Sequence, residues 1–419
     1  MAANPNTLTA GIKQTWDDVY QIVHYKQPTY RAFADFGLAA KLKVGNTVTR
    51  VYTSDLVVND MGADGSYQRQ ALTDTGESLV INKEKEASFY IKELDELQNH
   101  LPTRLKYARK AMNKLFLKVD GDVIGATADG AKNVVDNAEL GGSSGDAISL
   151  ADTNIDDVIN AARRALELEN VILDPAARFT GDVKKDAFQA IPMAIVSPHF
   201  LAQLRKRVGG KDSDLGDKVS VNGHIGNYLG FELFLSNALQ WTAELVMATN
   251  PTDGETITIN GVAWTFKDTL AAAAQIKIGA NAAATRLNVV AAINDAGTEG
   301  TNYNDVSAAN RIKLANITAT DDASNTKITF KGTGVGYVQV AETLSAAADV
   351  WTAAKQIQHN LFLVRGACSV VIQKTPEMFA ERRDGYVGFD VVTWTAYGFK
   401  VFDDQKPMVV NAKIQSSSW

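Results

Sequence analysis

Residues 101–124 read LPTRLKYARKAMNKLFLKVDGDVI, and their apolar side chains recur mainly at steps of three and four. At 100° per residue such side chains lie along one stripe of a helix, which is the strongest periodic signal in a sequence. Pro102 suits the first helical turn, where its missing N–H costs no hydrogen bond. We therefore predict one helix here, roughly 35 Å long, that runs across a whole domain.

The polar side of this predicted helix is basic. Its cationic residues are Arg104, Lys106, Arg109, Lys110, Lys114 and Lys118, and no acidic residue interrupts them. Like charges four residues apart oppose an isolated helix by roughly 0.2–0.5 kcal/mol per pair. One interpretation is a solvated face. The other is that something acidic from outside the helix lies against it.

Composition limits what the whole chain can do. The chain has 419 residues, 45% apolar residues and a net charge of −6, which leaves room for two or three domains with real cores. The negative charge argues against nucleic-acid binding by the molecule as a whole, so any basic surface must be local. The single cysteine, Cys368, lies in an apolar run and is interpreted as a packed, inert thiol. Without a secretory signal or a membrane span, we expect folding in a reducing cytoplasm.

The first part of the chain is expected to form an arm rather than a domain. Over residues 1–45, Pro28 interrupts any continuous helix. The aromatic residues are widely spaced and have no local core; they are Trp16, Tyr20, Tyr25, Tyr30, Phe33 and Phe36. Such side chains usually dock on another surface. We expect this arm, and Trp16 and Tyr20 in particular, to dock on a neighbouring subunit.

Residues 47–91 show strand patterns on either side of a turn-rich tip at 59–65. Residues 48–53 are expected to run outward, and residues 79–81 and 89–91 to return. A hairpin with so few apolar residues cannot bury itself and should project from the molecule. It carries many acidic residues, and we select Glu77, Glu84 and Glu86 as the counter-charge of the basic helix.

After the long helix the sequence alternates between helix and strand patterns. Helices are predicted near 155–166 and 198–208, the second with Ser197 as its N-cap and a stop at Gly209. Strands are predicted at 191–196 and 231–235, and two late strands, at 389–394 and 396–402, are expected to end the fold.

Between about 241 and 351 the composition shifts to Ala, Thr, Asn and Asp, which predicts a separate small α+β module. The expected hairpin spans 256–266 and turns at Asn260–Gly261. A helix is expected at 282–293, and the other strands at 276–278, 311–317 and 327–330.

No motif for catalysis or metal binding is found in a suitable context. Residues 141–145 match G-x-S-x-G, but they lie in a Gly/Ser-rich loop without the strand and helix that a nucleophile elbow needs. Residues 332–336, GTGVG, lack the spacing of a dinucleotide-binding loop and are interpreted as a strand turn. The five histidines are scattered without metal-ligand spacing. We therefore expect no enzymatic activity and no cofactor.

Two further segments complete a recognisable order of parts. The arm, the acidic hairpin and the basic helix are followed by SPHFLAQL at 197–204 and by GNYLGFELFLSN at 226–237. This order resembles the major capsid proteins of tailed bacteriophages, which have the HK97-like fold. The resemblance implies an α+β subunit with an N-terminal arm (1–45), an E-loop (46–92), a P-domain built on the long helix (93–150 and 371–415) and an A-domain (151–240 and 352–370). Residues 241–351 would be a domain inserted in the A-domain.

The resemblance also implies a function. The chain would be a structural subunit that forms hexamers and pentamers of an icosahedral or prolate phage head around double-stranded DNA. Portal, scaffolding or decoration proteins would be its partners, without a membrane or a cofactor, and it would assemble in the host cytoplasm and reside in the virion. The basic helix would face acidic residues of a neighbour's E-loop, or DNA phosphates without regard to base sequence.

Two alternatives remain open at this point. One is the shell of an encapsulin-like protein compartment, which has the same fold. The other is a surface glycan-binding role of the module at 241–351, for which Trp264 and Tyr303 are the candidate aromatic residues.

Overall fold

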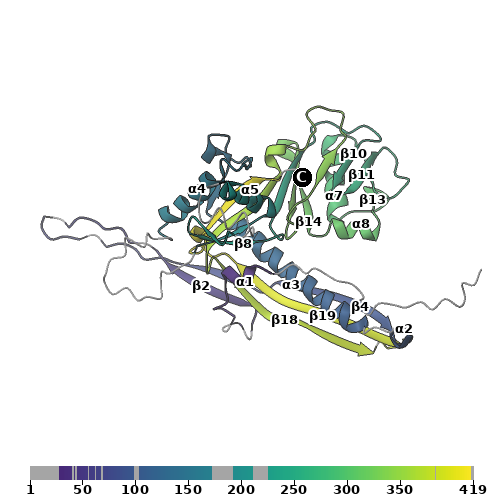
Figure 1. Cartoon of the computed structure of the whole chain (residues 1–419), viewed down its shortest axis with the longest axis horizontal. Coiled ribbons are helices and arrows are strands. Elements are labelled where there is room, and N and C mark those ends of the chain that lie inside the picture. The colour runs from purple at the N-terminus through teal and green to yellow at the C-terminus, as the bar shows by residue number, and fades with distance from the viewer. Residues whose placement is uncertain are drawn as a thin grey trace, which may run out of the picture.

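The computed structural model describes residues 28–39, 42, 45–54, 56–61, 63–67, 69–98, 103–171, 192–210, 225–382 and 384–416. Figure 1 shows an elongated layer, in which a long helix lies along a sheet, and a thicker body above it. A two-stranded hairpin extends from one end of the elongated layer. Separate stretches of the chain build the elongated layer, so its strands come together only in the folded molecule.

The elongated layer is a four-stranded sheet covered on one face by α3 (Thr103–Asp129). In spatial order its strands are β1 (Ala34–Asp35), β18 (Cys368–Arg382), β19 (Gly388–Lys400) and β4 (Lys83–Lys92). The apolar stripe of the helix is buried against this sheet through Val119, Val123 and Ile124. The predicted long helix is therefore confirmed, and it continues to Asp129.

A nine-stranded sheet forms the centre of the body. Its described strands are β7 (Asn227–Tyr228), β8 (Phe231–Leu235), β6 (Pro192–Val196), β17 (Ile357–Val364), β9 (Trp241–Val246), β15 (Lys327–Gly332), β14 (Ile317–Asp322), β20 (Val409–Gln415) and β5 (Asn133–Val135). Strand β17 is buried along its whole length because β6, β9 and β20 pair with it. The helices α4 (Ile155–Leu168) and α5 (Pro198–Gly209) pack on this sheet, where Ile159 and Phe200 are fully buried.

Residues 241–351 form the far side of the body, with a hydrophobic cluster made entirely of residues from this range. A five-stranded sheet contains β13 (Tyr303–Asn304), β12 (Gln275–Lys277), β11 (Val262–Lys267), β10 (Thr256–Ile259) and β16 (Val340–Glu342). The helices here are α7 (Ala282–Asn294) and α8 (Ala308–Lys313). Asn260 and Gly261 both have positive φ, as the predicted Asn-Gly turn requires.

The remaining elements are short or project from the layers. β2 (Thr47–Thr53) and β3 (Asp74–Val80) pair only with each other among the described strands and form the projecting hairpin. Two short helices are α1 (Tyr30–Phe33) and α2 (Glu93–Gln98). Turns of 3-10 helix are η2 (Asn137–Leu140), η4 (Ala323–Asn325), η5 (Ala353–Lys355) and η6 (Lys406–Met408).

The structure corrects the extent expected for the hairpin. Residues 89–91 do not return along it, because β4 pairs with β19 over ten positions, from Lys92 with Gly388 to Lys83 with Tyr397. The expected E-loop range of 46–92 therefore contains a strand of the four-stranded sheet. Alternation of polar and apolar residues indicates a strand but does not identify its partner, which explains the error.

Three further expectations about strands were wrong. Residues 311–317 are not a strand, because α8 continues to Lys313 and β14 begins at Ile317. The two late strands are one strand, β19, and the last described strand, β20, pairs with β17 in the nine-stranded sheet. Residues 409–415 and 133–135, which the resemblance assigned to the P-domain, pair in the nine-stranded sheet.

Candidate assembly surfaces

The far end of the β2–β3 hairpin carries a group of exposed apolar side chains, which we call the apolar tip. Its members are Leu56, Val57, Val58, Met61, Tyr67 and Leu72. Val58 is 97% exposed, and Figure 1 shows the end of the hairpin well away from the rest of the molecule. Sequence reasoning missed this surface because it weighed only the turn residues 59–65. The run Leu56–Val57–Val58 beside a turn was the available signal.

The base of the hairpin is fixed to the turn after β19 by charged side chains. One guanidinium nitrogen of Arg50 lies 2.9 and 2.8 Å from the two carboxylate oxygens of Asp404, and the Tyr52 hydroxyl donates to Asp404 at 3.1 Å. Burial, and then the neighbouring Asp404 carboxylate, raise the pKa of Tyr52 to about 12. Glu77 accepts the backbone N–H of Asp403 at 2.9 Å and lies 3.1 Å from Lys400 Nζ. Glu77 therefore already has a cationic partner within its own subunit.

The other two selected acidic residues lie on the four-stranded sheet. Glu84 and Glu86 are on β4, opposite Ala396 and Trp394 of β19. Tyr397 points to α3, where its hydroxyl donates to Asp122 at 2.7 Å, so its even-numbered neighbours point to the opposite face. Glu84 and Glu86 therefore lie on the helix-free face of this sheet, beside Trp394, which is 41% exposed.

The cationic residues of α3 lie on the other side of the same layer. Arg109 and Lys114 are exposed, while Lys106 and Lys110 are half-buried, with Lys110 Nζ 5.7 Å from the centre of the Tyr107 ring. Lys118 is paired within the helix, 2.9 Å from Asp122. The side chain of Arg104 lies outside the described residues. The elongated layer thus has a basic helical face and an opposite face that carries acidic and aromatic residues.

The expectations for the N-terminal arm divide into two groups. Trp16 and Tyr20 lie outside the described residues. Tyr30 and Phe33, however, are fully buried in the core of their own subunit, so docking elsewhere was wrong for them. The carboxylate of Asp120 on α3 accepts the backbone N–H groups of Thr29 at 2.7 Å and Tyr30 at 2.8 Å, which anchors α1 to the long helix.

The two aromatic residues on which the glycan-binding alternative depends are buried in the structure. Trp264 is fully buried and Tyr303 is 3% exposed, and their rings meet edge to face at 6.3 Å in the core of residues 241–351. Neither ring can stack on a sugar without unfolding this core. The core interpretation of these two residues is therefore the right one.

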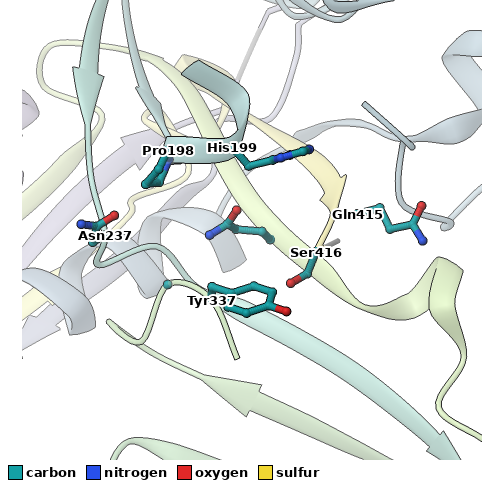
Figure 2. A pocket seen from close by; sticks show the side chains of 8 residues that line it. Pro198, His199, Asn237, Tyr337, Gln415 and Ser416 are labelled. Atoms are coloured by element: carbon teal, nitrogen blue, oxygen red, sulfur yellow. The ribbon is translucent and has the colours of Figure 1, made fainter. Parts of the chain in front are cut away.

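A hollow of about 90 Å³ lies where α5, β17 and the end of β20 meet the loop after β15. Figure 2 shows the side chains that line it. Its lining contains no carboxylate, lysine, arginine or cysteine: Pro198, His199, Asn237, Gly336, Tyr337, Gln358, Gln415 and Ser416. Burial lowers the pKa of His199 and raises that of Tyr337. The Ser416 hydroxyl is buried without a hydrogen-bond partner among the described residues, so it is not paired with His199 as a nucleophile with its base, and the lining holds no pair of carboxylates.

The remaining chemical groups are also arranged as structural parts. Cys368 is fully buried, as predicted, and burial raises the pKa of its thiol to about 12, which keeps it protonated and unreactive. Within the described ranges, no three His, Cys, Asp or Glu side chains are grouped as metal ligands. No described helix is both long enough and apolar enough to span a membrane.

A long helix on a four-stranded sheet, a projecting hairpin and a mixed-sheet body together define an HK97-like capsid fold. Similarity to solved structures supports this identification of the fold. A structure from Mycobacterium phage Che8 matches with a TM-score of 0.55 and 15% identity, over 97% of this chain and 98% of that one. The capsid structure of the cyanophage P-SCSP1u matches with a TM-score of 0.52 and 12% identity, over 97% of this chain and 93% of that one.

The capsid of cyanophage Pam1 matches over the whole of both chains, with a TM-score of 0.51 and 9% identity. No protein-family model and no curated protein sequence matches the chain. At such low identities these structures show the fold of this chain.

Proposed function

We propose that this chain is the structural major capsid protein of a phage, and that copies of it assemble into a closed head around double-stranded DNA. The observation that carries the proposal is the apolar tip on the projecting hairpin. Apolar side chains that nothing in the subunit covers favour association, by roughly 1.5–3 kcal/mol for each large side chain that becomes fully buried. Further copies of the same chain, repeated around closed rings, supply the covering surfaces.

The charges of the elongated layer support an arrangement in a single-layered shell. Arg109 and Lys114 expose positive charges on its helical face, and Glu84 and Glu86 expose negative charges on the other face. In such a shell one face of the layer turns inward. The basic face would meet DNA phosphates through contacts that ignore base sequence and weaken with salt. A neighbour's acidic residues are the second candidate partner of this face.

The three acidic residues selected from the sequence are not equally available to pair with the basic helical face of a neighbouring copy. Glu77 is engaged with Lys400 at the hairpin base, so it contributes to the orientation of the hairpin. Glu84 and Glu86 remain exposed and available to a basic surface of another copy or of a decoration protein. Portal and scaffolding proteins are further partners in this proposal, and the virion is its location.

The apolar tip can be tested directly. Replacement of Leu56, Val57 and Val58 by serine removes about half of the exposed apolar side chains of the tip without touching a core. We expect electron microscopy to show closed shells for the wild-type chain and dispersed subunits for this variant. Its thermal unfolding should match that of the wild type, because all three side chains are already exposed.

A matched control is available on residues 241–351. Leu287 is 57% exposed and Ile312 is 73% exposed, so serine at both positions removes two exposed apolar side chains away from the hairpin. This control should still assemble. Shells from the tip variant as abundant as those from the control would contradict the role of the tip. A wild-type chain that stays monomeric would contradict the proposed function, and shells that hold cargo protein instead of DNA would favour the compartment alternative.

A further inference from the structure

One edge of the four-stranded sheet is open over a short stretch of β18, which we call the open edge (residues 377–382). Strand β1 covers this side of β18 only at Cys368 and Ser369. The Gln373 side chain donates to the carbonyl of Gly45 at 3.0 Å, so the chain before β2 lies against the middle of β18. Beyond that point no described strand pairs with this side, and every residue from 377 to 382 is exposed. Figure 1 shows β18 along the rim of the layer.

The two long edges of this sheet differ in how they are protected. The opposite edge strand, β4, begins with Lys83–Glu84–Lys85–Glu86, and such charges oppose pairing with another strand. The open edge instead presents Met378, 39% exposed, and Phe379, 56% exposed. Unpaired backbone N–H and C=O groups beside apolar side chains form a template for a further strand.

We propose that the open edge pairs, antiparallel, with the open edge of a second copy about a local two-fold axis. This inference rests on the proposed function, because it describes one contact between subunits of the shell. The axis must be perpendicular to the sheet, since only that rotation brings two identical edges side by side with their strands antiparallel. Residues directly opposite each other then point to the same face, so their two numbers sum to an even number.

Charge selects one register among the possible ones. An axis at Phe379 places Glu377 opposite Glu381 of the second copy, and an axis at Glu381 places two copies of that residue together. Like charges directly opposite each other destabilise a strand pair. An axis at Ala380 avoids both pairings, while axes nearer the ends of the segment pair no more than half of it.

The selected register also fits the side chains. On the helix-free face Phe379 lies opposite Glu381 of the second copy. On the other face Met378 lies opposite Arg382 of the second copy, whose guanidinium is held by Glu93 at 2.7 Å, so its aliphatic stem is available for packing. Ala380 at the axis is small enough for the two backbones to approach closely. The contact is short, so it is weak in free subunits and effective where a shell holds the two edges together.

A cysteine at the axis tests this contact. In the Ala380→Cys variant, two identical residues face each other, at the short distance that a disulfide requires. The native Cys368 is fully buried and gives no background. After mild oxidation of assembled shells, we expect most of the protein to run as a dimer on a non-reducing gel. The double variant Phe379→Cys, Glu381→Cys should also form dimers, because these two positions oppose each other.

Met378→Cys is the matched control, since its sulfur would be four residues out of register with its copy and should remain a free thiol. Electron microscopy of the same samples records assembly separately from cross-linking. If both the Ala380→Cys variant and the double variant form intact shells but neither forms dimers, the edge contact is wrong. Equal cross-linking at position 378 would also overturn it. A wild-type chain that forms no shells would overturn the proposed function, and the contact with it.

Discussion

At the scale of single residues, His359 is a buried ionisable group that the fold keeps neutral. It lies in β17 and is 7% exposed, with Nε2 3.0 Å from Thr242 Oγ1 and Nδ1 2.9 Å from Asn411 Nδ2. A neutral ring satisfies both contacts by accepting at Nδ1 and donating at Nε2. Burial lowers the pKa of His359 to about 4. Asn411 and Asp129 oppose this shift by smaller amounts, and Lys413 and Lys331 lower the pKa slightly further.

This lowered pKa predicts a dependence of stability on pH. The unfolded chain takes up a proton on this ring near pH 6.5, and the folded chain only near pH 4. The contribution of His359 to the free energy of unfolding is therefore fully present above pH 6.5 and is lost as the pH drops toward 4. The loss is at most about 3 kcal/mol. Urea unfolding of the unassembled chain at pH 7.5, 5.5 and 4.5 measures it. The His359→Gln variant should show a flatter profile, and an unchanged slope would contradict this assignment.

Some residue contacts could not be read from the sequence. The loop at 332–336 was interpreted as a plain strand turn, but it crosses α3 so closely that a Cβ on Gly121 would lie 2.7 Å from Gly334 Cα. Gly334 has φ +70°, a conformation that other residues rarely adopt. The glycines were visible in the sequence, whereas their contact joins positions more than two hundred residues apart. Local patterns contain no information about such a pair.

At the scale of elements, the base of the hairpin depends on a few charged contacts more than on a core. Only a small apolar cluster, which includes Leu79 and Phe402, lies beneath it. The Arg50 guanidinium also covers the Phe402 ring at 4.2 Å while it pairs with Asp404. The hairpin is therefore attached to the turn that leads from the four-stranded sheet toward the nine-stranded one. Its direction should respond to these charges.

We expect Arg50→Glu to loosen the hairpin base, because it puts two carboxylates together and uncovers the Phe402 ring. Hydrogen exchange over 47–53 and 74–80 should become several-fold faster in the unassembled chain. Both side chains are partly exposed, so the global free energy of unfolding should fall by only about 1 kcal/mol. The double variant Arg50→Glu, Asp404→Arg restores opposite charges and should recover most of the protection. Equal exchange in the single and double variants would exclude the ion pair as the cause.

Elements were predictable from the sequence where a single pattern decides them. The α3 stripe and the Ser197–Pro198 start of α5 have such patterns, and the Ser197 hydroxyl does accept the Phe200 N–H at 3.1 Å. Strand partners were not predictable, because β4 could pair with β3 or with β19 on its alternation alone. The apolar tip was missed for another reason: exposure of apolar residues contradicts the usual pattern, and it arises here from a hairpin too thin to cover them.

At the scale of the whole molecule, residues 241–351 are both a unit and a continuation of the central sheet. Their hydrophobic cluster draws on no described residue outside the range. Strand β9 nevertheless pairs with β17, through Trp241 with Gln358 and Thr242 with Ile357. The Lys331 ammonium also pairs with Asp129 at the end of α3. These attachments fix the position of the unit on its host, whereas its internal core holds it together.

The two ends of this segment lie next to each other, as expected for an inserted domain. Leu245 forms a β-bridge with Trp351, and the Val246 N–H donates to the Val350 carbonyl at 3.0 Å. The chain could therefore leave and re-enter the host at one place. We propose that 241–351 folds alone, and that a short Gly/Ser linker from Gln240 to Thr352 can replace it in the host, which keeps the host-core residues Ala238 and Leu239.

The excised segment should unfold cooperatively on heating, with an enthalpy of about 60–80 kcal/mol, as for other domains of roughly 100 residues. Circular dichroism and calorimetry measure this. The shortened chain should remain soluble with the elongated layer intact, although β17 loses its pairing with β9 and should exchange its amide hydrogens faster near Ile357. If the excised segment melts without cooperativity and the shortened chain is insoluble, the pairing of β9 with β17 is essential to one common core. Residues 241–351 are then not a separate domain.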